Sequence, residues 1–181
     1  MSDDITLYHG STANFDAIDL KQCRPYKDFG QGFYCFETRS QAIGIAVRNY
    51  NIELAKFKAQ QDVAIPLQKW LYTYEFMRSA LCKLSVKVFD VAGKEWLKFV
   101  TDNRRSAMPI HGYDIVIGPT ADDRTNAAIQ LYFSGGYGQV GQDRSMEILL
   151  EVLMPDNLPP QTFFATERAV EFLTQIRKER I

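Results

Sequence analysis

The pattern of apolar and polar residues predicts strands and helices in mixed order. Short β-like runs, rich in aromatic and β-branched residues or alternating in polarity, occur six times. The predicted strands span 5–9, 32–36, 70–76, 84–89, 113–119 and 161–165. Apolar residues at helical spacing occur in five other segments. The predicted helices span 41–57, 94–103, 122 or 123 to 133, 145–153, and a terminal helix that starts at Thr166. The mixed order predicts an α+β fold.

Length and composition are those of one globular domain. The chain has 181 residues, which we expect to form a single domain over 1–181, without a linker or an internal repeat. No apolar run approaches the ~20 residues of a membrane helix, so we expect no membrane partner. The start, Met1-Ser2-Asp3-Asp4, lacks the pattern of a signal peptide. Three cysteines without CxxC spacing are typical of reduced thiols in a cytoplasmic protein.

The net charge and the number of histidines limit the kinds of ligand that we expect the protein to bind. The net charge is −1, which argues against tight nonspecific binding to nucleic acid. The chain holds only two histidines and no paired cysteines, so we expect no metal site. The basic group Lys21, Arg24 and Lys27 lies between two motifs described next, where a diphosphate could pass. Arg24 is a candidate for that contact on charge alone.

Two motifs near the start of the chain carry the strongest chemical signal. The first is Tyr8-His9-Gly10-Ser11 at the end of a predicted strand, and the second is Gly30-Gln31-Gly32-Phe33-Tyr34. An aromatic face can hold a flat cation such as nicotinamide by stacking. A glycine backbone and a serine hydroxyl can satisfy a carboxamide, and a histidine nitrogen can bond a ribose hydroxyl. Each motif alone would be an ordinary strand or turn, but the two in this order favour an NAD site.

This pair of motifs resembles the His-Gly-Ser and Gly-x-Gly-x-Tyr-Phe segments of ADP-ribosyltransferases of the diphtheria-toxin and poly(ADP-ribose) polymerase class. The resemblance implies two small, roughly perpendicular β-sheets with flanking helices, and NAD as the substrate. The implied NAD-binding residues are His9, Gly10, Ser11, Arg24, Gly32, Phe33, Tyr34 and Ile45. Ile45 stands where the family has a second stacking tyrosine. The middle of the chain looks like an uncharacterised bacterial branch of that superfamily, some of whose members are encoded beside toxin–antitoxin partners.

The third element of the family is a Glu that opens a late strand, and Gln161 stands at that position here. The resemblance therefore implies the catalytic set His9, Tyr34 and Gln161. An amide can bond the ribose hydroxyl, but it supplies neither negative charge nor a base. Transfer of a single ADP-ribose with little base help is one explanation. Another carboxylate could act instead, the candidates being Glu37, Asp122, Asp123 and Glu167. A third explanation is that the site binds NAD without turning it over. A fourth is that the amide has replaced an original carboxylate.

The function that follows is transfer of one ADP-ribose from NAD to a protein or nucleic acid, as a bacterial toxin or effector. A cognate antitoxin or inhibitor protein is the implied partner beside the macromolecular acceptor. Two alternatives stay open: a non-catalytic NAD-binding or interaction module, and an NAD glycohydrolase in which water replaces the acceptor. The fold resemblance alone does not decide among them.

Overall fold

The computed structural model describes residues 4–60, 67–121, 123–153 and 158–181, with the side chains of 60, 123 and 124 left out. These residues form an α+β protein with two sheets and several helices, as the order of apolar patterns predicts. They divide into two compact units that are interleaved in sequence. Unit 1 comprises 1–19, 34–84 and 167–181, and unit 2 comprises 20–33 and 85–166. No helix in the described ranges is both long enough and apolar enough to cross a membrane.

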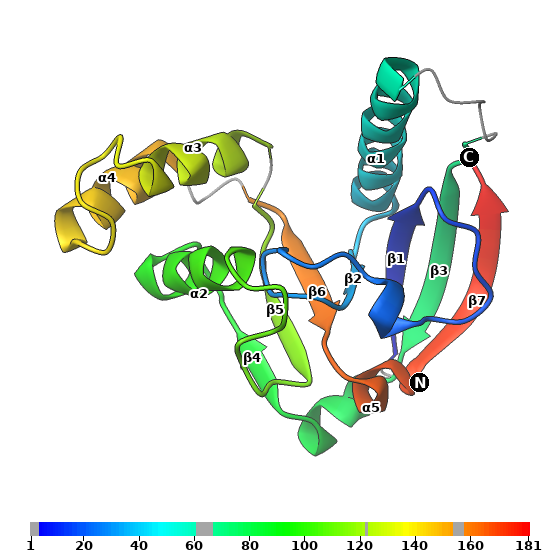
Figure 1. The fold of residues 1–181 in the computed structure, drawn as a ribbon. Helices are drawn as coiled ribbons and strands as arrows, with labels where there is room; N and C mark the ends of the chain where they lie inside the picture. Colours follow the sequence, from blue (N-terminus) through cyan, green and yellow to red (C-terminus); the bar gives the residue numbers. More distant parts are fainter. Residues whose placement is uncertain (1–3, 61–66, 122, 154–157) are drawn as a thin grey trace. The chain divides into compact units, whose positions relative to one another are not determined.

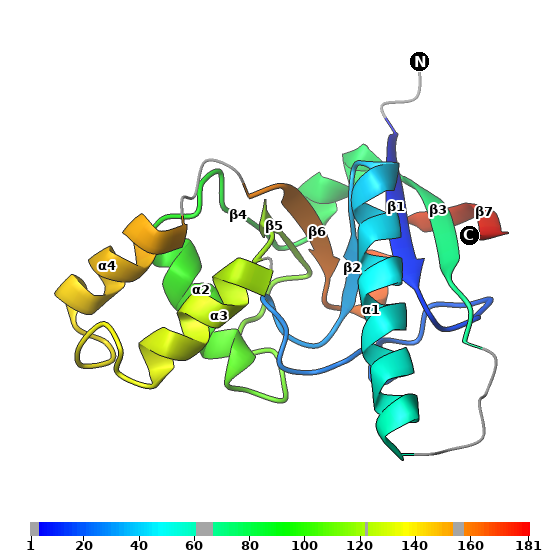
Figure 2. The same cartoon turned by 90° about the horizontal axis from the view of Figure 1, so that it is seen from above.

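Unit 1 is built on a three-stranded antiparallel sheet with β3 at its centre. The order is β1-β3-β7, with β1 at Ile5–Ser11, β3 at Trp70–Phe76 and β7 at Leu173–Arg180. The long helix α1 (Arg39–Gln60) lies along β1 (Figures 1 and 2). A short 3-10 helix (Arg78–Lys83) follows β3, and α5 (Glu167–Val170) precedes β7. The central strand is buried on both faces from Leu71 to Tyr74.

Unit 2 contains the remaining helices and most of the second sheet, whose order is β2-β6-β5-β4. Strand β2 (Phe33–Cys35) crosses the division between the units after Phe33, and β4 (Val86–Val88), β5 (Ile115–Pro119) and β6 (Pro160–Phe164) lie in unit 2. A 3-10 turn (Leu20–Gln22) opens the unit. Helices α2 (Lys94–Arg104), α3 (Asp123–Phe133) and α4 (Asp143–Leu153) lie together in Figure 1. Trp96 of α2 is fully buried, and its indole N–H donates to the Pro119 carbonyl over 3.1 Å.

The predicted terminal helix is wrong beyond its first turn. Residues 167–170 are helical, but Leu173–Arg180 form the edge strand β7, paired with β3 from Trp70↔Arg180 to Phe76↔Leu173. The prediction rested on Ala169, Val170, Phe172 and Leu173, whose spacing is that of one helix face. Pairing with the buried strand β3 satisfies its second edge, and this tertiary contact overrides the local propensity. Asp122, one of two predicted caps of α3, lies outside the described residues.

Candidate functional site

His9 lies on β1 directly opposite Tyr72 of β3. Residues directly opposite each other in an antiparallel pair point to the same face of the sheet, so the two rings are cross-strand neighbours. Their centroids are 6.0 Å apart. The apolar lead-in Ile5-Thr6-Leu7-Tyr8 therefore delivers the histidine to one face of the unit 1 sheet, as the first motif predicts.

The His9 ring joins the two sequence motifs. Its Nδ1 lies 2.7 Å from the carbonyl oxygen of Tyr34, 25 residues further along the chain. A carbonyl can only accept, so Nδ1 carries the proton and Nε2 is the acceptor nitrogen of the neutral ring. Burial lowers the pKa of His9 to about 4, although the bond to the Tyr34 carbonyl works in the opposite direction. His9 is therefore a neutral imidazole at physiological pH, suited to accept a hydrogen bond.

Besides this contact, β1 pairs with Phe36, the residue that follows β2, in an isolated bridge. Tyr8 and Phe36 exchange two backbone hydrogen bonds of 2.8 Å each, in an isolated antiparallel bridge. In a continued ladder the next such pair would be Gly10 and Tyr34. The His9 ring bonds the Tyr34 carbonyl instead, and the ladder stops. Because backbone groups alternate in direction along a strand, the N–H and C=O of Gly10 point toward the Tyr34 side of β1 and away from β3.

Gly10 also has a structural reason to be glycine. A Cβ at this position would lie 1.8 Å from the backbone oxygen of Ala42 in α1. Its close approach to the helix fixes how α1 packs on β1. Gly32 is similar within unit 2, where a Cβ would meet the Phe163 ring at 2.4 Å. Both motif glycines are therefore required for packing, whether or not they bind a ligand.

Ser11 and the following loop close over the same sheet face. The Ser11 hydroxyl accepts a 3.0 Å hydrogen bond from the Ala13 N–H, so its proton is left to donate to another acceptor. The Phe15 ring then stacks on Tyr72, with the centroids 4.1 Å apart. Sequence reasoning missed Phe15 and Tyr72, since neither belongs to a motif and 57 residues separate them.

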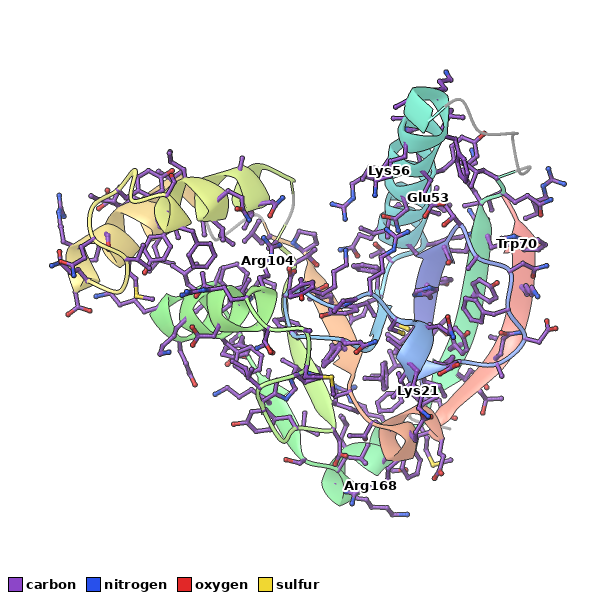
Figure 3. All side chains as sticks on the ribbon, viewed as in Figure 1. Lys21, Glu53, Lys56, Trp70, Arg104 and Arg168 are labelled. Carbon is purple, nitrogen blue, oxygen red and sulfur yellow. The ribbon has the colours of Figure 1, made fainter. Side chains whose placement is uncertain are left out.

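Gln161 of β6 belongs to a buried polar network in unit 2. Its Nε2 donates to Asp28 Oδ2 over 2.8 Å, and Arg104 donates to Asp28 Oδ1 over 2.6 Å from Nη2 and 2.9 Å from Nε. The Ala121 N–H donates to Oδ2 as well. Figure 3 labels Arg104 at the end of α2. One amide hydrogen of Gln161 is thus committed to a carboxylate that already has an arginine partner. The approach of Gln161 to His9, in the other unit, stays a prediction.

The other predicted site residues lie in varied surroundings. Arg24 is exposed in unit 2, whereas Phe33 is buried in β2. Ile45 packs on the cluster of Phe36, Ala42 and Leu71 in unit 1. Among the alternative carboxylates, Glu37 and Glu167 are exposed. Asp122 lies outside the described residues, as does the side chain of Asp123.

The second histidine, His111, has a structural role in unit 2. Its Nε2 donates to the Phe29 carbonyl over 2.8 Å, and its Nδ1 accepts from the Tyr113 N–H over 3.2 Å. Burial lowers the pKa of His111 as well. Within the described residues, no group of three or more His, Cys, Asp or Glu side chains is arranged to hold a metal ion.

The fold and the site together define an α+β protein in which a neutral histidine on one strand bonds the carbonyl of a tyrosine on another. The chain belongs to the family described as "Protein of unknown function (DUF3990)", which it matches over residues 5–175. No curated protein and no solved structure matches it.

Proposed function

We propose that this protein is an ADP-ribosyltransferase that takes NAD as its substrate. In the reaction the bond between the nicotinamide nitrogen and ribose C1′ breaks, and nicotinamide leaves with the electron pair. A nucleophile on the acceptor forms the new bond to C1′ and gives up its proton. The transition state carries positive charge on the ribose, so fixed dipoles and correct positioning supply much of the catalysis.

The interrupted pairing at Gly10 and Tyr34 is the observation that carries this proposal. A carboxamide has one acceptor and one donor group, and the C=O and N–H of Gly10 are the matching backbone groups. Both point to the side of β1 where the ladder with β2 stops. We therefore assign Gly10 to the nicotinamide carboxamide, with the Ser11 hydroxyl as a further donor.

His9 and Tyr34 complete the proposed nicotinamide-ribose site. The neutral His9 ring offers Nε2 as an acceptor for a ribose hydroxyl, because Nδ1 is engaged by the Tyr34 carbonyl. The Tyr34 side chain is the stacking surface for the pyridinium ring. His9 comes from β1 and Tyr34 from the part of β2 that belongs to unit 1, 25 residues further along the chain.

The proposal extends to the fold family. Two small sheets of three and four strands, with flanking helices, are compatible with the ADP-ribosyltransferase fold. The roles of Arg24, Gly32, Phe33, Ile45 and Gln161 in NAD binding, and a bacterial toxin or effector held in check by a partner, rest on the resemblance of the motifs alone.

The decisive experiment measures nicotinamide release from NAD by the purified protein, with the His9→Ala variant as control. We expect release with the wild type, and none with His9→Ala at an unchanged melting temperature. Binding of NAD without release would favour the non-catalytic module, and release with free ADP-ribose as the sole product would favour a glycohydrolase. Absence of both binding and release would overturn the proposal.

A second experiment identifies the acceptor class. Labelled NAD is incubated with the protein and a bacterial lysate, and the labelled material is then digested with protease or with nucleases. Label released only by protease would identify a protein acceptor. Label released only by nuclease would identify a nucleic acid, against the expectation from the net charge of −1.

A further inference from the structure

Tyr72 links the centre of the unit 1 sheet to the loop that follows the His9 motif. Its side chain is fully buried, and its hydroxyl makes two hydrogen bonds to that loop. The hydroxyl donates to the Ala13 carbonyl and accepts from the Phe15 N–H, each over 2.9 Å. A single phenol oxygen therefore fixes the backbone on both sides of residue 14.

The same loop carries an aromatic ring onto His9. Phe15 stacks on Tyr72 at 4.1 Å with an interplanar angle of 12°. It also lies edge-on to the His9 imidazole, with the centroids 5.9 Å apart and the planes at 63°. Tyr72 itself is 6.0 Å from the imidazole at 52°. With the Tyr34 carbonyl on Nδ1, three groups from different segments bound the His9 ring.

A surface ion pair lies beyond Tyr72 and contributes less to this arrangement. Lys178 of β7 lies 5.8 Å from the Tyr72 ring centre, and its Nζ is 2.7 Å from Asp16 Oδ1. The Asp16 side chain is 95% exposed, and pairs of that kind are typically worth about 0–1 kcal/mol. The Tyr72 hydroxyl is the stronger attachment of the loop, because it belongs to a fully buried side chain and makes two hydrogen bonds to the loop backbone.

We propose that Tyr72 is a positioning residue for His9, holding Phe15 against the imidazole so that the ring keeps one orientation toward the ribose of NAD. The inference rests on the proposed function for the identity of the ligand. The geometry is independent of the proposed function, because the contact among the rings of His9, Phe15 and Tyr72 is a property of the protein alone. Tyr72 is fully buried, so its effect on the ligand passes through the loop and through His9.

Removal of one hydroxyl tests the proposal without a substrate. In Tyr72→Phe the loop loses both hydrogen bonds, so water gains access to His9 and the imidazole is desolvated less. Side-chain ¹⁵N–¹H spectra can follow the titration, since the chain has only two histidines. Lys178 and Asp16, whose charges act on Tyr72, are both retained. We expect the pKa of His9 to rise by about one unit or more toward its usual 6.5.

Tyr74→Phe is the matched control. Tyr74 lies two residues further along β3 on the same face, is 2% exposed, and its hydroxyl bonds Gln175 on β7. This variant also removes a phenol hydroxyl from the same strand, the one that bonds Gln175 on β7, and we expect His9 to titrate as in the wild type. An unchanged titration of His9 in Tyr72→Phe, or an equal rise in both variants, would overturn the proposal.

Phe15→Leu is a second variant that leaves the Tyr72 hydroxyl in place. It keeps the loop backbone bonds but removes the aromatic contact with His9. We expect the pKa of His9 to rise in this variant also, and a protein that folds but titrates like the wild type would count against the proposal.

The activity arm uses nicotinamide release from NAD. We expect kcat/KM of Tyr72→Phe to fall about tenfold or more, since small displacements of a positioned group are costly to the rate, whereas Tyr74→Phe should stay within about twofold. An unaltered kcat/KM in Tyr72→Phe overturns the positioning role. If the wild type neither binds NAD nor releases nicotinamide, the proposed function fails, while the titration still decides whether Tyr72 orients His9.

Discussion

Gln161 donates a 2.8 Å hydrogen bond to Asp28, and the two side chains are 4% and 7% exposed, although 133 residues separate them. Gln161→Glu would place a carboxylate against the Asp28 carboxylate in a buried site. We expect a loss of about 3 kcal/mol in the free energy of unfolding at pH 7, since a buried pair of like charges must be neutralised. Urea unfolding measures this cost.

Two further measurements isolate the charge in that experiment. Gln161→Met keeps the approximate shape of the side chain and removes its hydrogen bonds to Asp28 and to the Pro119 carbonyl without adding a charge, so we expect a smaller loss of about 1–2 kcal/mol. The cost of Gln161→Glu should also shrink as the pH is lowered, because protonation of the introduced carboxyl removes the repulsion. Equal stability losses for the Met and Glu variants at pH 7 would contradict the like-charge explanation.

The lowered pKa of His9 predicts a pH dependence of stability. With a folded pKa of about 4 against 6.5 when unfolded, the native state binds the proton less tightly than the unfolded state. The contribution of His9 is therefore fully present above pH 6.5 and is lost as the pH falls toward 4. It amounts to roughly 3 kcal/mol at most. We expect His9→Gln to be less sensitive to acid than the wild type, measured by urea unfolding at pH 7.5 and 4.5. A parallel loss in both proteins would contradict this.

Gly10 and Gly44 form a matched pair of glycine substitutions. Gly10→Ala would bring a Cβ to 1.8 Å from the Ala42 carbonyl oxygen, whereas nothing lies within 4 Å of a Cβ at Gly44 in α1. We expect Gly10→Ala to destabilise the protein by about 3 kcal/mol. Gly44→Ala should stabilise it by about 0.5–1 kcal/mol through helix propensity. Thermal unfolding of both variants checks this, and a neutral Gly10→Ala would mean that α1 can move away from β1.

Alanine variants of Tyr34 and Tyr26 test whether the Tyr34 ring stacks on the nicotinamide of NAD, as the proposed function requires. Tyr34→Ala keeps the backbone carbonyl that bonds His9, so the change affects only the phenol ring. Loss of stacking on a pyridinium costs roughly 1–2 kcal/mol, or about a tenfold weaker Kd for NAD. Tyr26 is 56% exposed and serves as the control. Calorimetry that finds equal affinities for Tyr34→Ala and Tyr26→Ala would remove Tyr34 from the site.

Local patterns predict most elements of this fold. The strand at Trp70–Phe76 has the predicted bounds, and α2 and α3 differ from prediction by about a residue, because aromatic strands and amphipathic helices carry their own periodicity. The local sequence does not predict strand β7. Its charged sequence has no strong alternation, and its conformation depends on β3, about a hundred residues earlier.

In the candidate site too, local motifs predict some residues, whereas long-range contacts define the others. His9 and Tyr34 are found from motifs that span a few residues each, and the structure brings His9 Nδ1 to the Tyr34 carbonyl. Phe15 and Tyr72 carry no motif, and their contact depends on how the loop after β1 packs on β3. The Asp28 partner of Gln161 is likewise a long-range contact, and no local pattern indicates it.

The position of β3 between β1 and β7 has a consequence for the order of folding during synthesis. Strand β1 leaves the ribosome first, β3 about sixty residues later, and β7 about a hundred residues after that. All of unit 2 from Ser85 to Thr166 is made before β7. The central strand must therefore keep one edge unpaired throughout that interval, when a chaperone or another β-edge could bind it.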